Sequence, residues 1–410
     1  MTSRLRWMMI ALAFVATLIN YLDRQALSVA APILEVQFHM SSTGYSQVLF
    51  AFMLAYTIMN GFSGLLIDRL GTKMGYGLFV AWWSLCGVLH VLASGVWSLG
   101  IFRFLLGLGE AGNWPAAVKV VAEWFPPEER SLASGIFNSG SSVGAILAPP
   151  VIAALVLRFG WRSAFAVTGA LGFVWLAAWS VFYRSPTAQV NVPTPTSPPP
   201  LRELLRSRFV LTFAVSKVFL DPVWYFYIFW FPTYLFHVRH FDMASIGRYA
   251  WIPFFVAGMG NIAGGLMAKG FLKCKMRITV ARKTAVSVAA VLMTAAIPAV
   301  LVPEASSSIA LVSIAMAGYT AALANMLAMP SDVFPAQGVA SVYGVASMGS
   351  GFGGMVFALL TGWLVDRYSY IPAFWLFGLI PLICVFVLWF LMGPLEPKSI
   401  SLGESIAGSS

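Results

Sequence analysis

Ionisable side chains interrupt the apolar segments of this sequence at only a few places. Asp23 and Arg24 follow Tyr21 inside one apolar run, and Arg103 and Glu110 lie inside another. A charged side chain within a long apolar run is costly to bury, so it usually marks a functional site. Arg can bind a carboxylate through two parallel hydrogen bonds, and a carboxylate in a low-dielectric cleft can exchange a proton. These four charged residues are therefore candidates for anion binding and proton transfer.

The run that holds Arg103 and Glu110 reads SLGIFRFLLGLGEAGNWPAAVKVVAEWF. The two charges are two helical turns apart and share a face, with Gly107 between them. The glycines keep this face thin, which is typical of a cavity wall, although a structural ion pair would use the same residues. Pro115 lacks a backbone N–H and should bend the helix, and Lys119 is interpreted as an anchor at the membrane surface.

A second charged pair, Lys217 and Asp221, is spaced one helical turn apart and can bridge on a single helix face. A structural role and a role in ligand binding both remain open for it. In the aromatic stretch that follows, Tyr225 and Tyr227 are candidates for contact with a ligand, although most aromatic residues there would serve packing. Further polar residues in apolar runs could bind a hydroxylated ligand or join helices; they are Tyr56, Asn60, Asn138, Tyr319, Asn325 and Ser347.

The composition explains where these side chains must be held. The chain has 410 residues, of which 59% are hydrophobic and 10% are charged, against about 25% charged residues in an average soluble domain. A soluble fold cannot cover so much apolar surface, whereas a lipid bilayer can surround it. Each membrane-spanning helix needs roughly 20 apolar residues, so the chain has room for about a dozen spans with their loops.

Twelve apolar segments are long enough to cross a bilayer as helices, which satisfy their own backbone hydrogen bonds in lipid. With a cytoplasmic N-terminus, most Lys and Arg residues fall in cytoplasmic segments, as the positive-inside rule requires. The loop residues on the other side are Arg158, Arg162, Arg239, Arg248 and Arg367. We therefore expect both termini in the cytoplasm. The predicted spans lie near residues 7–31, 44–66, 75–94, 98–122, 131–156, 163–183, 209–236, 245–268, 281–302, 308–329, 338–364 and 369–392.

Two halves of similar sequence are joined by a polar segment. Phe125-Pro126 recurs as Phe334-Pro335, and at the same spacing Gly140 and Gly144 recur as Gly349 and Gly353. Such a repeat predicts two six-helix bundles related by an axis along the membrane normal, with substrate bound between them. The predicted fold is thus an all-α membrane protein of twelve helices in two pseudo-symmetric bundles. The expected boundaries are a first bundle at 1–183, a cytoplasmic linker at 184–208, a second bundle at 209–395 and a cytoplasmic tail at 396–410.

Several classes of function are disfavoured. The net charge of +10 is explained by positive-inside topology, so no nucleic-acid partner is expected. The three cysteines are far apart and the four histidines show no metal-ligand spacing, so we expect no disulfide, metal or cofactor. No phosphate-binding loop or catalytic constellation stands out, and no segment is long enough for a soluble domain. The sequence therefore predicts neither an enzyme nor an ATP-driven pump.

The loop after the second predicted span reads GLLIDRLGTK. Its first glycine could allow close helix approach, its acidic residue could bind a base or cap a helix, and its basic residues hold the loop in the cytoplasm. The motif, a predicted gating element, comprises Gly64, Asp68, Arg69, Gly71 and Lys73.

Four segments resemble the anion:cation symporter family of the major facilitator superfamily: NYLDR, GLLIDRLGTK, FRFLLGLGEAGNWPAAVKVVAEWFPPEERSLASGIFNSG and KVFLDPVWYFYIFWFPTYL. This family includes bacterial hexuronate and galactonate transporters and, more distantly, vesicular glutamate carriers and sialin. The similarity covers nearly all of residues 1–395. It implies proton-coupled uptake of a small organic anion, usually a sugar acid, by alternating access in the bacterial inner membrane.

The resemblance also implies roles for single residues of the first half. Asp23 would be a proton-carrying carboxylate, and Glu110 a second titrating group close to the substrate. Arg24 would contact the substrate carboxylate, and Arg103 would be the charge partner of Glu110. Two tyrosines would donate hydrogen bonds to substrate oxygens; they are Tyr21 and Tyr56.

In the second half, Tyr319 stands where hexuronate-like members carry a His, whereas Asn325 keeps their Asn. The choice between hexuronate, hexonate and aldarate therefore stays open. An exporter of drug-like or other metabolites is the alternative, although the Arg residues favour an anion. The expected partners are the organic anion, protons and lipid, and the chain is expected to function as a monomer.

Overall fold

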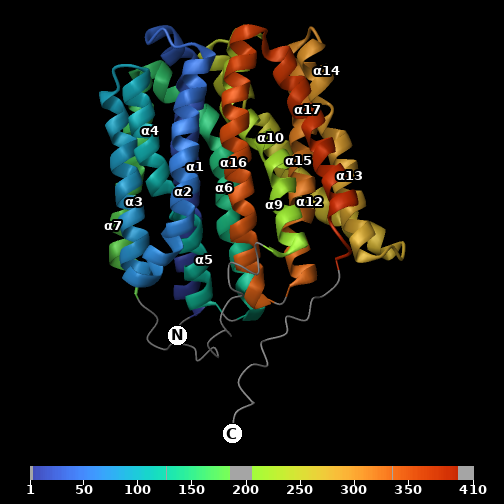
Figure 1. Cartoon of the computed structure of the whole chain (residues 1–410). Coiled ribbons are helices and arrows are strands. Elements are labelled where there is room, and N and C mark those ends of the chain that lie inside the picture. Colours follow the sequence, from blue (N-terminus) through green and yellow to red (C-terminus); the bar gives the residue numbers. More distant parts are fainter. Residues whose placement is uncertain (1–2, 126, 185–205, 335, 396–410) are drawn as a thin grey trace.

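The computed structural model describes residues 3–125, 127–184, 206–334 and 336–395, and every regular element in these ranges is helical. Figure 1 shows long helices running between the two ends of the molecule. The N-terminal half comprises α1 (Ser3–Gln37), α2 (Ser42–Leu70), α3 (Thr72–Leu89), η1 (His90–Leu92), α4 (Val96–Glu110), α5 (Asn113–Trp124), α6 (Pro127–Phe159) and α7 (Trp161–Phe182). The C-terminal half comprises α9 (Arg208–Leu220), α10 (Pro222–His237), α11 (Met243–Tyr249), α12 (Ile252–Lys273), α13 (Ile278–Met293), α14 (Ala296–Leu301), α15 (Ala305–Val333), α16 (Ala336–Arg367), α17 (Tyr370–Phe386) and η2 (Val387–Leu391).

The helices match the predicted spans. In the described part of the chain, eleven helical stretches are long and apolar enough to cross a membrane. The remaining predicted span, 98–122, is formed by α4 and α5, whose 15 and 12 residues are each too few to cross alone. The chain is thus a multi-pass membrane protein with the predicted twelve-helix fold.

Proline explains where spans are divided into two helices. α10 begins at Pro222, and the first turns of α5, α12 and α14 hold Pro115, Pro253 and Pro298. Proline has no backbone N–H to donate, so the first turn of a helix is where it costs least. Each of these prolines lies in the first turn of a new helix within a predicted span.

The glycines of the repeat allow close helix packing in both halves. A Cβ on Gly140 or Gly144 of α6 would stand 2.4 or 2.7 Å from a backbone oxygen of α1. A Cβ on Gly349 or Gly353 of α16 would stand 2.2 or 2.4 Å from a backbone oxygen of α9. In each half these glycines therefore let one long helix lie directly against the first helix, as close helix packing in membranes requires.

The two halves are bonded to each other at one end of the molecule. Asp366, at the end of α16, accepts hydrogen bonds from the backbone N–H groups of Ser42 at 2.9 Å and Thr43 at 2.6 Å. These are orphan donors of the α2 N-terminus, so the carboxylate of one half caps a helix of the other. Nearby, Nε2 of His237 lies 2.6 Å from Oε2 of Glu35.

At the opposite end of the molecule, ion pairs and hydrogen bonds join helices of the same half. There the ion pairs Arg6–Glu129 and Lys119–Asp68 lie within the N-terminal half, and Arg208 bonds to the Leu391 carbonyl within the C-terminal half. The bonds between halves made by Asp366, His237 and Tyr45 lie at the end where α1 stops and α2 starts, or just inside it. The molecule is closed at that end.

The predicted linker at 184–208 and tail at 396–410 fall almost wholly outside the described residues, as do Pro126 and Pro335 of the repeat. α7 ends at Phe182 and α9 begins at Arg208. The described chain starts and ends at the same end of the molecule (Figure 1). The boundaries of the linker and of the tail stay predictions.

Candidate functional site

The predicted charges of α1 lie on two faces of that helix. Adjacent residues of a helix point about 100° apart, so Asp23 and Arg24 meet different neighbours. Arg24 turns toward α2 and α4, where it lies beside Tyr56 and Glu110. Asp23 turns toward α7, beside Thr168. The two residues are therefore parts of different clusters, as the sequence allowed.

Arg24 and Glu110 form a buried ion pair that joins α1 to α4. Nε of Arg24 donates at 3.0 Å and Nη2 at 2.9 Å, both to Oε2 of Glu110. The two residues are only 5% and 0% exposed. Oε1 of Glu110 has no hydrogen-bond partner among the described residues, and Nη1 of Arg24 donates to none of them. The pair thus keeps a donor and an acceptor for other partners.

Aromatic rings surround the Arg24 guanidinium. Its carbon Cζ lies 5.2 Å from the ring centre of Tyr21, 5.3 Å from that of Phe52 and 4.8 Å from that of Tyr56. The faces of aromatic rings attract a cation, most strongly where water is scarce. The structure thus brings Tyr21 and Tyr56 to the predicted anion-binding residue, and it adds Phe52.

Tyr225 approaches the same guanidinium from the C-terminal half. It lies close enough to Arg24 to interact electrostatically with it. Its ring lies against Gly354 of α16, as does the side chain of Met53 of α2. Its hydroxyl lies 3.3 Å from Oγ of Ser350. The Arg24 cluster therefore sits where α1 and α2 of one half meet α10 and α16 of the other.

Asp23 and Arg103 lie behind this cluster, inside the N-terminal half. Arg103 donates to the backbone oxygens of Arg24 at 3.3 Å and Asp23 at 3.5 Å. Thr168 lies beside the Asp23 carboxylate without a well-aligned hydrogen bond, and neither carboxylate oxygen has another partner in the described chain. The ion-pair partner of Glu110 is Arg24 and not the predicted Arg103, because the Arg103 guanidinium reaches the α1 backbone instead.

The helix break after Glu110 has a clear cause. Because Pro115 has no N–H, the carbonyl of Ala111 loses its helical donor. Ser63 of α2 donates to this carbonyl at 3.3 Å and replaces that donor. The predicted bend at Pro115 is confirmed, and it leaves Glu110 as the last residue of α4.

The glycines around Glu110 serve close packing. A Cβ on Gly107 would stand 2.5 Å from the backbone oxygen of Phe52, and one on Gly109 would stand 2.8 Å from Trp83. The prediction that this glycine face is an open cavity wall is wrong in this structure, because α2 and α3 cover it.

The charges of the C-terminal half form a separate cluster. Nζ of Lys217 lies 2.7 Å from Oδ2 of Asp221, and both residues are buried. The Tyr319 hydroxyl donates to Oδ1 of Asp221 at 3.3 Å, and Trp224 stacks on the Tyr319 ring at 5.5 Å. Tyr319, predicted to bind substrate, therefore lies beside Asp221, and its assignment stays a prediction.

Asn325 lies deeper in the C-terminal half. Its Nδ2 donates at 3.0 Å to the backbone oxygens of Gly264 and Ala321, and its Oδ1 accepts from Arg282 at 3.4 Å. These bonds join α15 to α12 and α13. The structure gives Asn325 a packing function, and its contact with substrate stays a prediction.

The loop motif lies at the end of the molecule opposite the contacts of Asp366 with Ser42 and Thr43. Asp68 pairs with Lys119 of α5 at 2.7 Å, so Lys119 is an ion-pair partner and not only an anchor at the membrane surface. A Cβ on Gly64 would meet nothing within 4 Å, so the predicted close helix approach at Gly64 is wrong in this structure. Gly71 has φ +78°, a left-handed backbone conformation that glycine adopts readily. The remaining members of the motif, Arg69 and Lys73, are exposed.

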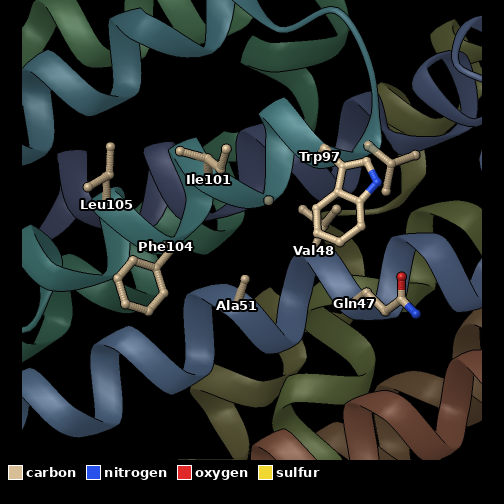
Figure 2. A pocket seen from close by; sticks show the side chains of 9 residues that line it. Gln47, Val48, Ala51, Trp97, Ile101, Phe104 and Leu105 are labelled. Carbon is tan, nitrogen blue, oxygen red and sulfur yellow. The ribbon is translucent and has the colours of Figure 1, made fainter.

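A hollow between α2 and α4 contains none of the predicted site residues. Figure 2 shows its lining, which includes Val48, Ala51, Trp97 and Phe104. Trp97 is 88% exposed, as expected for an apolar side chain that faces lipid. Within the described ranges, His, Cys, Asp and Glu residues form no group of three or more that could hold a metal ion.

Sequence reasoning missed several polar contacts of these clusters. The residues predicted from sequence did not include Ser350, nor Asn20, which accepts from Nη2 of Arg24 at 3.4 Å. Glu35 and His237 meet across the two halves, and no spacing in the sequence relates them. The repeat could have drawn attention to Ser350, because it corresponds to Ser141 of the first half.

Comparison with known proteins identifies the fold and the family. The sequence pattern of the Major Facilitator Superfamily matches residues 13–282 and 276–407. The chain has the fold of a D-xylose-proton symporter, with a TM-score of 0.76 and 13% identity over 95% of this chain and 99% of that one. A bacterial homolog of the human lysosomal transporter Spinster, in an inward-facing and occupied conformation, gives a TM-score of 0.74 with 21% identity over 95% of each chain.

Curated relatives are similar over most of their length. A hexuronate transporter of Escherichia coli is 33% identical over 94% of this chain and 93% of its own. A galacturonate transporter of Dickeya chrysanthemi is 36% identical over 70% of this chain and 89% of its own, and a hexuronate transporter of Bacillus subtilis is 30% identical over 86% of each. This chain belongs to the Major Facilitator Superfamily.

Proposed function

We propose that this protein is a proton-coupled transporter that imports a sugar acid by alternating access. The relatives named as hexuronate and galacturonate transporters support the substrate class. The observation that carries the proposal is the buried Arg24–Glu110 pair, which stands in an aromatic cage where the two halves meet.

Arg24 binds the substrate carboxylate in this proposal. A guanidinium offers a fork of donors that matches a carboxylate, and it stays charged when buried. Nη1 has no acceptor among the described residues, and Nε and Nη2 become available when Glu110 withdraws. Tyr21, Tyr56 and Tyr225 surround the guanidinium and supply hydroxyls for the rest of the ligand.

Glu110 couples the proton to the substrate. When the substrate carboxylate takes its place on Arg24, Glu110 would be left ionised, buried and without a cation. Such a charge is costly in a low-dielectric site, so Glu110 takes up a proton. Releasing the proton and the substrate restores the ion pair.

Alternating access uses the contacts between the halves. The bonds of Asp366 to Ser42 and Thr43, and of His237 to Glu35, hold one end shut. By the positive-inside pattern this is the outer end, so the substrate site opens next toward the cytoplasm. In the family fold, the two bundles rock about a central site to expose it to the other side.

The remaining assignments follow from the same topology. We place the protein in the bacterial inner membrane with both termini in the cytoplasm, because Lys and Arg residues concentrate on that side. One chain supplies both walls of the Arg24 cluster, which supports function as a monomer.

Uptake into proteoliposomes tests the proposal. Purified protein should accumulate radiolabelled galacturonate or galactonate when the outside is acidic, and accumulation should fall when the pH gradient is collapsed. Glu110→Gln should keep exchange of labelled for unlabelled substrate but lose accumulation driven by the gradient. The exposed Glu304 gives a matched control, since Glu304→Gln should behave as wild type. Gradient-driven accumulation by Glu110→Gln at the wild-type level would contradict the coupling.

Asp23 is proposed as a second proton carrier. Its carboxylate is buried inside the N-terminal half, close to Arg103 and without a well-made hydrogen bond. Asp23→Asn should therefore reduce the dependence of uptake on the pH gradient while leaving substrate binding measurable. Uptake by Asp23→Asn at the wild-type rate and with the wild-type pH dependence would remove Asp23 from this role.

A further inference from the structure

We propose that the site selects sugar acids with a single carboxylate, held by Arg24, and that Tyr225 and Ser350 of the C-terminal half bind the hydroxylated end. This inference rests on the proposed function and narrows its substrate class. It excludes aldarates, which carry a carboxylate at each end, from the preferred substrates.

The first argument is the number of cations that a substrate can reach. Among the described residues, the buried Arg and Lys side chains are Arg24, Arg103, Lys217 and Lys283. Arg24 alone of these lies where the halves meet. Arg103 is directed at the α1 backbone inside its own half, and Lys283 donates to the Met392 carbonyl at the end of the C-terminal half.

Lys217 is neutralised by its own helix. Its ammonium lies 2.7 Å from one oxygen of Asp221, and Tyr319 donates to the other oxygen. The residues of this ion pair are 3% and 5% exposed. A second substrate carboxylate would therefore have to compete with Asp221, which is already held by two partners. The side of the site formed by the C-terminal half, the C-terminal wall, thus offers the substrate no net positive charge.

The second argument is that the C-terminal wall offers the substrate two hydroxyl groups. The hydroxyls of Tyr225 and Ser350 face each other at 3.3 Å, longer than the usual 2.7–2.8 Å of a hydroxyl–hydroxyl bond. Each hydroxyl can donate and accept, as sugar hydroxyls do. A loosely bonded pair of hydroxyls can exchange its mutual bond for bonds to a polyol at little cost. This wall therefore matches the neutral end of a sugar acid.

The third argument is charge balance. In the empty site the Arg24–Glu110 pair is neutral. When one carboxylate replaces Glu110 and Glu110 takes up one proton, the site stays neutral. A second ionised carboxylate would leave one uncompensated negative charge buried between the bundles, which is strongly unfavourable. For the Arg24–Glu110 pair, the geometry thus favours one substrate carboxylate for the one proton that Glu110 takes up.

A matched set of six-carbon ligands tests the inference. Binding of galacturonate, galactonate and galactarate to the full-length protein in nanodiscs would be measured by titration calorimetry at pH 7, where all their carboxylates are ionised in solution. We expect the two monocarboxylates to bind at least about tenfold more tightly than galactarate, as a site with one unmatched buried charge requires. Galactarate binding as tight as galacturonate binding would overturn the inference and leave the proposed function standing. Failure of all three ligands to bind would contradict both.

Substitutions of two tyrosines on α10 test whether the hydroxyls of the C-terminal wall bind the substrate. Tyr225→Phe and Ser350→Ala should each weaken galacturonate binding about five- to tenfold, the loss expected for one hydrogen bond. Tyr227 is the matched control, because it is fully buried and its hydroxyl has no hydrogen-bond partner in the described chain. Tyr227→Phe should leave binding unchanged. Thermal melting would show that both variants are folded. Equal galacturonate affinities of Tyr225→Phe and Tyr227→Phe would then refute the assignment of Tyr225 to substrate binding.

Discussion

The two halves of the molecule hold their buried charges in different ways. In the N-terminal half, the Arg24–Glu110 pair joins two helices, α1 and α4, that are far apart in the sequence. In the C-terminal half, Lys217 and Asp221 lie one turn apart at the junction of α9 and α10. The first pair can be opened by a ligand or by a shift of one helix against the other, whereas the second moves as a unit with its helix.

In the proposed function, this difference lets one half respond to substrate while the other serves as a fixed wall. The partner of Glu110 changes in that proposal, because Arg24 binds the substrate carboxylate in its place. Asp221 keeps Lys217 and Tyr319 through any rigid-body motion of the C-terminal half, since all three belong to that half. The following predictions test this division, beginning with the largest expected effect.

Replacing Arg24 by Lys should nearly abolish transport. Lys keeps the positive charge but lacks the planar fork that binds a carboxylate and stacks on aromatic rings. We expect sugar-acid uptake in proteoliposomes to fall roughly 100-fold, the scale of effect for a buried charge that loses its hydrogen-bonded partner. Arg248→Lys, at an exposed position, should transport normally. A rate of uptake by Arg24→Lys above about a third of the wild-type rate would contradict the assignment of Arg24 to carboxylate binding. So small a decrease is less than the loss of one net hydrogen bond would cause.

Asp221→Asn should damage stability but not coupling, in contrast to Glu110→Gln. The change leaves Lys217 buried without its counter-ion, so we expect the free energy of unfolding to fall by about 3 kcal/mol. Thermal melting of the purified protein measures the loss. The molecules that fold should still accumulate substrate in response to a pH gradient. Loss of that response in Asp221→Asn would mean that both halves carry protons.

Adding a methyl group where the halves touch should shift the balance of conformations. A Cβ on Gly362 of α16 would stand 2.3 Å from Oγ of Ser46 and 2.7 Å from the backbone oxygen of Ser42. We expect Gly362→Ala to destabilise the closed end, where α2 meets α16, by about 1–2 kcal/mol. Spin labels at the exposed Val36 and Tyr368 would measure the distance between the halves at this end. In Gly362→Ala, a larger fraction of molecules than in wild type should show a long distance between the two labels.

Gly258 is the matched control for this change, because a Cβ there would meet nothing within 4 Å. Gly258→Ala should leave the distance distribution as in wild type and could raise stability slightly, since alanine restricts the unfolded chain. A shift of equal size in both variants would show that the α2–α16 contact does not control closure.

The smallest effect is expected for Asp366→Asn. An amide accepts from the Ser42 and Thr43 N–H groups more weakly than a carboxylate, and it loses the attraction to the α2 N-terminus, worth about 0.5–1 kcal/mol at a partly exposed site. The same spin-label pair should therefore show a modest rise in open conformations. Asp242 caps α11 within its own half, so Asp242→Asn should not change the distances. An unchanged distance distribution in Asp366→Asn would show that the Asp366 cap does not help to hold this end closed.

Much of the fold could be predicted from sequence because the relevant signals are local. Apolar run length determines the spans, and Pro115 and Pro222 indicate where spans four and seven divide. The repeat of Gly140 as Gly349 anticipated equivalent packing in both halves. The candidate charges were also found, because a charge in an apolar run is unusual.

The sequence by itself determined how many helices cross the membrane and which few side chains carry charge inside it. Only the tertiary structure decided that Glu110 pairs with Arg24 and not with Arg103, that Asn325 joins helices, and that Asp366 caps a helix of the other half. Spacing along one helix tells which residues share a face, but a contact between helices depends on their rotation and depth. Those are set by close packing of whole helix surfaces, often at glycine, and no local pattern encodes them.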